Sequence, residues 1–208
     1  MKTTVKKTPP HLWLAPAVFV GSLTPAAALL IRALRGELGA NPIPQMLNQL
    51  GLVTLIFLVA ALACTPLKTL FGWTWPIRLR RMLGLYAFFY AMLHVSTYTG
   101  LDQFFDWQAI LADVTKRKFI FVGFTAFVLL IPLAVTSTNA AVKRMGYARW
   151  KQLHRLAYVA PLFGVIHFTW RVKKDVSEPT LYAIVLGALL LIRVVTYARS
   201  RLSSSAAS

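Results

Sequence analysis

The sequence predicts an all-α integral membrane protein, a bundle of six transmembrane helices. Of its 208 residues, 57% are apolar and only 14% are charged, whereas a soluble domain has about 45–50% apolar and about 25% charged residues. The segments 41–67, 82–101 and 119–142 contain no Asp, Glu, Lys or Arg. At roughly 20 residues per crossing, the chain has room for six spans and short loops. These observations exclude an ordinary soluble domain and a disordered chain.

Six apolar segments define the expected helices. The first four are long and uncharged, whereas the fifth carries Lys151 and Arg155 in its first turns and the sixth reaches Arg193. Basic side chains near a helix end can extend to the interface, so both remain candidate spans. The expected spans are 12–31, 46–66, 82–101, 118–136, 150–170 and 180–198. They form one domain, 12–198, between an N-terminal segment, 1–11, and a tail, 199–208, that we expect to be disordered.

Basic residues predict the orientation in the membrane. The termini and the second and fourth loops carry 13 Lys and Arg residues, against 8 in the other three loops. The positive-inside rule therefore places both termini in the cytoplasm. The net charge of +17 lies between apolar runs, which indicates contact with anionic lipid headgroups and not nucleic acid. A cleaved secretory signal is the alternative for the start, but its apolar run, Leu12–Ile31, is longer than a usual signal core.

Three histidines in the third and fifth expected spans are candidate ligands. An ionisable group at membrane depth is costly and indicates function by default, although an interhelical hydrogen bond is the alternative for each. Zinc sites usually add Cys or carboxylate ligands, and proton relays usually use mid-span Asp or Glu, which these spans lack. Paired imidazoles among aromatic and aliphatic residues suit b-type haem. The candidates are His94, His154 and His167.

Helix direction predicts two depths for these histidines. The third and fifth spans run the same way, so His94 and His167, both late in their spans, lie at similar depth toward the outer side. His154 lies near the cytoplasmic side. The residue of the third span at the same depth as His154 is Arg80. With a helical rotation of about 100° per residue, Arg80 lies on the same face of its helix as His94. We expect His94 and His167 to ligate one haem. On an ideal helix, His154 and His167 lie roughly 140° apart. It therefore stays open whether both face the interior of one bundle.

Three sequence segments resemble one protein family. They are RRMLGLYAFFYAMLHVSTY (80–98), FTAFVLLIPLAVTST (124–138) and WKQLHRLAYVAPLFGVIHF (150–168). Over nearly the whole chain, the sequence resembles MsrQ (formerly YedZ), the haem-binding membrane subunit of the periplasmic methionine sulfoxide reductase system. That family is similar to the membrane domain of ferric reductases and NADPH oxidases. Larger relatives carry two His on each of two helices and a fused flavin domain, whereas here Arg80 replaces the first His of the third span.

The resemblance implies a ferric reductase-like electron-transfer subunit with one or two b-type haems, in which His94, His154 and His167 are axial iron ligands. It implies electrons from the quinone pool, with FMN bound. These electrons pass to the periplasmic molybdopterin-dependent subunit MsrP, which reduces methionine sulfoxide in oxidised proteins. The catalytic sulfoxide site is then on the partner, and this chain has no catalytic residue of its own.

Three arginines are candidate cofactor-binding residues. Arg80 stays protonated and is a poor metal ligand, so we expect it to bind a haem propionate, a flavin phosphate or a quinone carbonyl. Arg155 is adjacent to His154, and Arg171 follows His167 by one helical turn. Either can pair with a propionate, and the alternative for both is a basic side chain reaching the interface.

Two other function classes stay open on the sequence alone. One is a transporter or metal permease that uses the histidines as transient ligands, and the other is an assembly subunit with structural histidines. Only the electron-transfer subunit requires a haem absorption band that changes on reduction.

Overall fold

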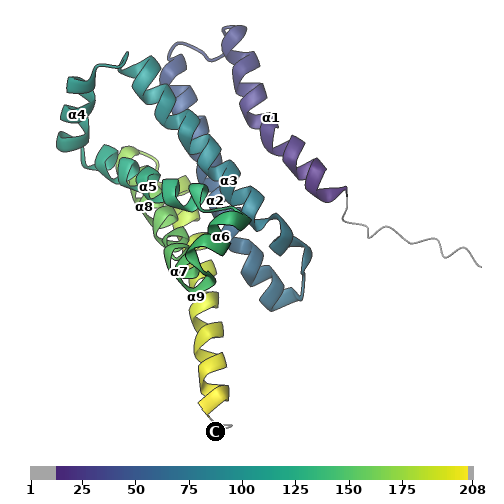
Figure 1. Cartoon of the computed structure of the whole chain (residues 1–208). Coiled ribbons are helices and arrows are strands. Elements are labelled where there is room, and N and C mark those ends of the chain that lie inside the picture. The colour runs from purple at the N-terminus through teal and green to yellow at the C-terminus, as the bar shows by residue number, and fades with distance from the viewer. Residues whose placement is uncertain (1–12, 206–208) are drawn as a thin grey trace, which may run out of the picture. The chain divides into compact units, whose positions relative to one another are not determined.

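The computed structural model describes residues 13–205, and within them every regular element is a helix (Figure 1). The predicted all-α class is therefore confirmed. The chain divides into two compact units, residues 1–42 and 43–208, where the sequence predicted one domain over 12–198. The predicted N-terminal segment 1–11 and the last residues of the predicted tail, 206–208, lie outside the described residues.

The first unit contains α1 (Leu14–Leu34), which corresponds to the first predicted span. Its 21 residues are long and apolar enough to cross a membrane. The helix ends before Gly36, whose φ of 69° is a left-handed conformation that glycine adopts without a Cβ clash.

Three helices of the second unit are also long and apolar enough to cross a membrane: α2 (Pro42–Phe71), α5 (Lys118–Val135) and the first part of α9 (Ser177–Ser205). They correspond to the predicted spans 46–66, 118–136 and 180–198. The helix α9 continues to Ser205, so its last turns occupy residues that the sequence predicted to be a disordered tail from 199 onward.

The other two predicted spans are less regular. The helix α3 (Trp75–Ser96) carries basic residues in its first turns and continues directly into η1 (Thr97–Asp102), a π-helix. The predicted span 150–170 is not one helix. It consists of α7 (Tyr147–Leu153) and α8 (Leu156–Arg171). At the break between them, backbone hydrogen bonds reach back three residues and not four, as from Ala157 N–H to His154 O.

Short helices complete the second unit. The helix α4 (Trp107–Lys116) lies between η1 and α5, and its N-terminus is capped by Asp106, whose carboxylate accepts hydrogen bonds from two backbone N–H groups. The helix α6 (Asn139–Met145) connects α5 to α7 through Gly146, which has a φ of 78°.

An apolar core joins α2, α3, α5 and α8. It includes Leu58, Ala87, Leu130 and Ala160, one from each helix, and both alanines are fully buried. Small residues let helix backbones approach closely within a membrane. The helix α8 packs along α5 and along α9 (Figure 1). The same four helices that form this core also supply most of the candidate site.

Candidate functional site

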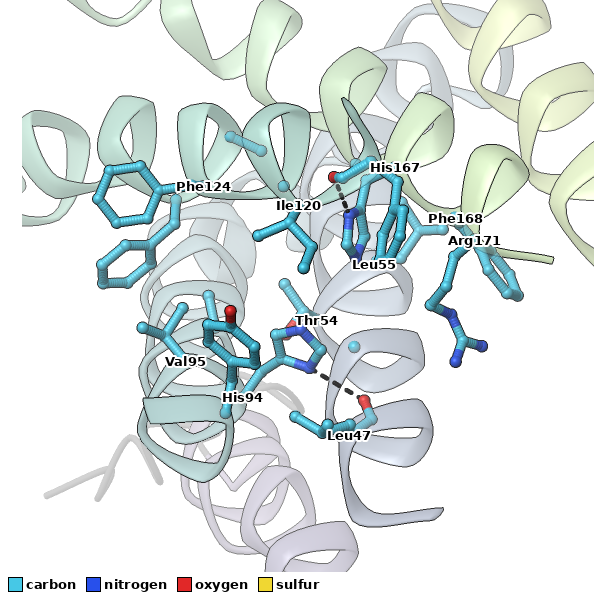
Figure 2. Close-up of a pocket in the computed structure, with 18 of the residues that line it drawn as sticks. Leu47, Thr54, Leu55, His94, Val95, Ile120, Phe124, His167, Phe168 and Arg171 are labelled. Atoms are coloured by element: carbon cyan, nitrogen blue, oxygen red, sulfur yellow. Dashed lines mark hydrogen bonds between the residues drawn. The ribbon is translucent and has the colours of Figure 1, made fainter. Parts of the chain in front are cut away.

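The second unit encloses a cavity of about 350 Å³ between α2, α3, α5 and α8, with η1 and α4 at its edge. This volume lies within the about 300–1,000 Å³ that is usual for ligand sites. Most of its lining side chains are apolar, and His94 and His167 project into it from α3 and α8 (Figure 2). The structure therefore brings together the two histidines that helix direction placed at one depth.

Each cavity histidine donates a hydrogen bond to a backbone carbonyl on a neighbouring helix. The distance from His94 Nδ1 to Leu47 O is 2.9 Å, and the distance from His167 Nδ1 to Phe119 O is 2.7 Å (Figure 2). Because a carbonyl oxygen only accepts, each Nδ1 carries the proton. Each ring therefore keeps a free lone pair on Nε2, which is the usual arrangement of a metal-binding histidine.

The two imidazole rings lie 6.2 Å apart, measured between centroids, and their planes are nearly perpendicular at 87°. A bond from a metal ion to an imidazole nitrogen is about 2 Å long. The separation therefore leaves room for one metal ion between the rings. Ligation by His94 and His167 stays a prediction, but their positions and hydrogen bonds fit it.

Arg171 is the predicted arginine that lines this cavity. Its guanidinium donates a hydrogen bond to Asn48 Oδ1 on α2, and it lies 5.9 Å from the centre of the Phe168 ring. These contacts hold a positive charge beside His167. An anionic group of a ligand in the cavity would find a bidentate partner there.

Asp113 connects the helices at the edge of the cavity. Its carboxylate accepts a hydrogen bond from the Tyr98 hydroxyl at 3.1 Å and forms an ion pair with Arg117 at 3.1 Å. These contacts tie α4 to η1 and to the start of α5. As a result, Ile110 and Val114 of α4 line the cavity.

His154 lies outside this cavity and is held in a different way. Its Nε2 lies 3.0 Å from Thr136 Oγ1, and that hydroxyl already donates to Pro132 O at 2.6 Å. Since the hydroxyl has one proton, His154 Nε2 donates this bond. The Trp150 ring stacks on the imidazole with centroids 4.0 Å apart. His154 thus has its lone pair on Nδ1, the opposite nitrogen to that of the cavity pair.

The other two predicted arginines lie away from the cavity. Arg80 donates a hydrogen bond to Thr65 Oγ1 at 3.4 Å and lies close enough to His154 for its charge to act on that imidazole. A shared role for Arg80 and His154 stays a prediction. Arg155 is exposed at the start of α8 and does not line the cavity.

Sequence reasoning missed the groups that orient the cavity histidines. The acceptors are backbone carbonyls of Leu47 and Phe119, which have no signature in the side chains. Gly51 and Gly123, each one helical turn after an acceptor, lie against the two imidazoles. A glycine inside a predicted span was the available signal, because it often indicates a close approach.

The ligand set restricts the chemistry of the site. Within residues 13–205, no three His, Cys, Asp or Glu side chains converge on one position where they could hold a metal ion. A tetrahedral zinc site needs at least three such ligands. Two imidazoles suffice for a haem iron, because the porphyrin supplies four nitrogens and leaves only the axial positions to the protein.

Comparison with known proteins assigns the chain to a family. Residues 47–165 match the family described as ferric reductase like transmembrane component. A protein-methionine-sulfoxide reductase heme-binding subunit MsrQ from Rhodospirillum rubrum is 53% identical over 192 residues, which cover 92% of each chain. The protein of that name from Herminiimonas arsenicoxydans is 50% identical over 194 residues, covering 92% of this chain and 89% of the relative. The Deinococcus radiodurans protein is 49% identical over 194 residues, covering 93% and 96%.

The chain belongs to the MsrQ family. The resemblance noted in the three sequence segments is thereby confirmed. The ferric reductase-like region contains His94 and His154 together with Arg80, and His167 follows just after it near the end of α8. In this MsrQ-family chain, most of the cavity-lining residues lie within the region that matches the ferric reductase like transmembrane component.

Proposed function

We propose that this chain is a haem b-containing electron-transfer subunit of the bacterial inner membrane. It carries electrons from the quinone pool to the periplasmic molybdenum enzyme MsrP, for the repair of methionine sulfoxide in oxidised proteins. The names of its relatives support haem binding and a role in a methionine sulfoxide reductase. The observation that carries the proposal is the pair His94 and His167, which face one cavity with both Nδ1 protons bound to carbonyls.

The residues of the cavity have separate roles in this proposal. When bound, haem supplies a centre that accepts and releases one electron. His94 and His167 would hold its iron through Nε2, and the carbonyls of Leu47 and Phe119 would orient the rings and make them stronger donors. Arg171 pairs with a propionate. The apolar lining excludes water, which helps to set the redox potential.

The cytoplasmic side receives the electrons. Arg80 is close enough to His154 for its charge to act on the imidazole, and an arginine suits a quinone carbonyl, a flavin phosphate or a propionate. FMN is proposed from the family resemblance, without assigned residues. If His154 ligates a second haem through Nε2, its hydrogen bond to Thr136 has to break first, because Nε2 carries the proton of that bond.

The proposed topology has six spans, with both termini in the cytoplasm. Four helices are long and apolar enough by themselves, and α3 and the pair α7–α8 complete the set. The helix α8 alone has 16 residues, fewer than the about 20 of a full crossing, so α7 and the turn at His154 contribute to this span. His94 and His167 then lie toward the periplasmic partner.

An absorption spectrum of the purified full-length chain tests the function. We expect a Soret band that shifts when dithionite is added, and we expect His94→Ala and His167→Ala each to lose most of it. Arg78→Ala is the matched control, because Arg78 is exposed on the same helix as His94 and does not line the cavity. A wild-type chain without the band that transported a divalent metal in liposomes would support a permease in its place.

A further inference from the structure

Two glycines lie directly against the cavity histidines. A Cβ atom added at Gly123 would lie 2.5 Å from His167 Nδ1 and 2.8 Å from His167 Cε1. A Cβ added at Gly51 would lie 3.3 Å from His94 Cε1 and 3.4 Å from His94 Nδ1. The first contact is impossible without a displacement, and the second is tight. Each imidazole therefore rests on helix backbone that a side chain would cover.

The same arrangement occurs twice in the site. The acceptor carbonyls, Leu47 and Phe119, each lie four residues before one of these glycines, and they are 47 and 48 residues away from His94 and His167. On an α-helix, a side chain covers the turn on the N-terminal side of its own Cα. A side chain at 51 or 123 would therefore cover the carbonyl that the histidine uses. Glycine leaves both carbonyls open.

We propose that Gly51 and Gly123 are positioning residues of the haem site. By leaving the carbonyls of Leu47 and Phe119 accessible, they select the Nδ1-protonated form of His94 and His167 and orient Nε2 toward the cavity. The same arrangement, a glycine on one helix against a histidine on its neighbour, occurs between α2 and α3 and again between α5 and α8. This inference rests on the proposed function. The distances also rank the two positions, with Gly123 the less tolerant.

The test compares four variants of the full chain by haem per protein and by the midpoint potential of the haem. Gly123→Ala should lose most of its haem, because His167 cannot keep its position. Gly51→Ala should keep haem but with a higher midpoint potential, because a weakened hydrogen bond to Leu47 O makes His94 a weaker donor. Gly84→Ala and Gly187→Ala are the matched controls, since neither residue lines the cavity and a Cβ added at either meets nothing within 4 Å. Both controls should match the wild type.

Two results would overturn the inference. One is a Gly123→Ala protein with wild-type haem content and potential. The other is a Gly51→Ala protein with an unchanged midpoint potential. If size-exclusion chromatography shows that Gly123→Ala fails to fold, the result for Gly51→Ala alone tests the inference. A wild-type chain without any haem band would instead contradict the proposed function, so the two failures are distinguishable.

Discussion

At the scale of single residues, hydrogen bonds decide which nitrogen of each histidine is free. His94 and His167 donate through Nδ1 to carbonyls, whereas His154 donates through Nε2 to Thr136. The first two have the form in which histidine usually binds a metal. His154 has to exchange its proton or its partner before it can do the same through Nε2. The cavity pair is therefore ready for a ligand, and His154 is not.

Arg80→Ala should leave the haem spectrum of the His94–His167 pair intact and slow its reduction by quinol. A charge-assisted hydrogen bond is worth about 1.5–3 kcal/mol, so we expect the rate at low quinol concentration to fall about tenfold or more. His154→Ala should slow the reduction as well, and it should also remove a second haem if His154 ligates one. Stopped-flow absorption after mixing with a quinol measures the rate.

Arg78→Ala is the control for this prediction, because Arg78 is also an exposed arginine in the first turns of α3. If Arg80→Ala and His154→Ala matched the wild type in reduction rate and haem content, Arg80 and His154 would have no part in electron entry.

Sequence reasoning identified the candidate ligands but not what holds them. Histidine at membrane depth is conspicuous, and helix direction was enough to pair His94 with His167. The partner of Arg193 could not be found in the same way. Its guanidinium donates to Leu62 O at 2.6 Å and to the Tyr158 hydroxyl at 3.1 Å, which ties α9 to α2 and α8. A backbone carbonyl on another helix has no periodicity or motif, so such contacts appear only in three dimensions.

At the scale of elements, α4 covers one edge of the cavity and is held there mainly by Asp113. This carboxylate contacts Tyr98 and Arg117, and its side chain is only 17% exposed. Leu111 and Trp107, on another face of α4, are 66% and 68% exposed. Aromatic and apolar side chains of this kind suit the membrane–water interface.

Asp113→Asn should loosen α4, because it removes the ion pair with Arg117 and weakens the bond from Tyr98. Loss of charge-assisted contacts of this kind costs about 1–3 kcal/mol, so we expect a lower midpoint of thermal unfolding. The reduced haem should also be oxidised faster by ferricyanide, a water-soluble oxidant. Asp175→Asn is the control, at an exposed carboxylate in the connection before α9. Equal oxidation rates in both variants would show that α4 does not limit access.

Periodicity predicted most elements within a few residues, and it failed where the backbone changes its hydrogen-bond pattern. The span 150–170 was predicted as one helix, yet a tight turn at His154 and Arg155 separates α7 from α8. Similarly, α3 widens into the π-helix η1 after Ser96. Polar residues lie near both changes, but a hydrophobic period does not indicate where a helix alters its hydrogen-bond pattern.

At the scale of the whole molecule, basic residues are distributed unevenly between the loops. We expect reporter fusions after residues 110 and 175 to report the periplasm, and fusions after residue 145 or at the C-terminus to report the cytoplasm. The physical reason is that Lys and Arg near short loops are retained on the cytoplasmic side. Alkaline phosphatase and green fluorescent protein activities of matched fusions provide the measurement.

A periplasmic C-terminus would contradict this topology and reverse the depth of every histidine. A control fusion after residue 72, in the connection between α2 and α3, should behave like the fusion after residue 145, since basic residues flank both positions.

If haem binds between His94 and His167 as proposed, the angle of 87° between their rings has a magnetic consequence. An imidazole donates π electrons mainly perpendicular to its plane, so two perpendicular rings act on different iron d orbitals and leave these orbitals close in energy. In the ferric state, the unpaired electron then keeps much of its orbital angular momentum. We expect a strongly anisotropic low-spin signal in low-temperature electron paramagnetic resonance, dominated by one large g value. A moderately split rhombic spectrum would mean that the rings become parallel when haem binds.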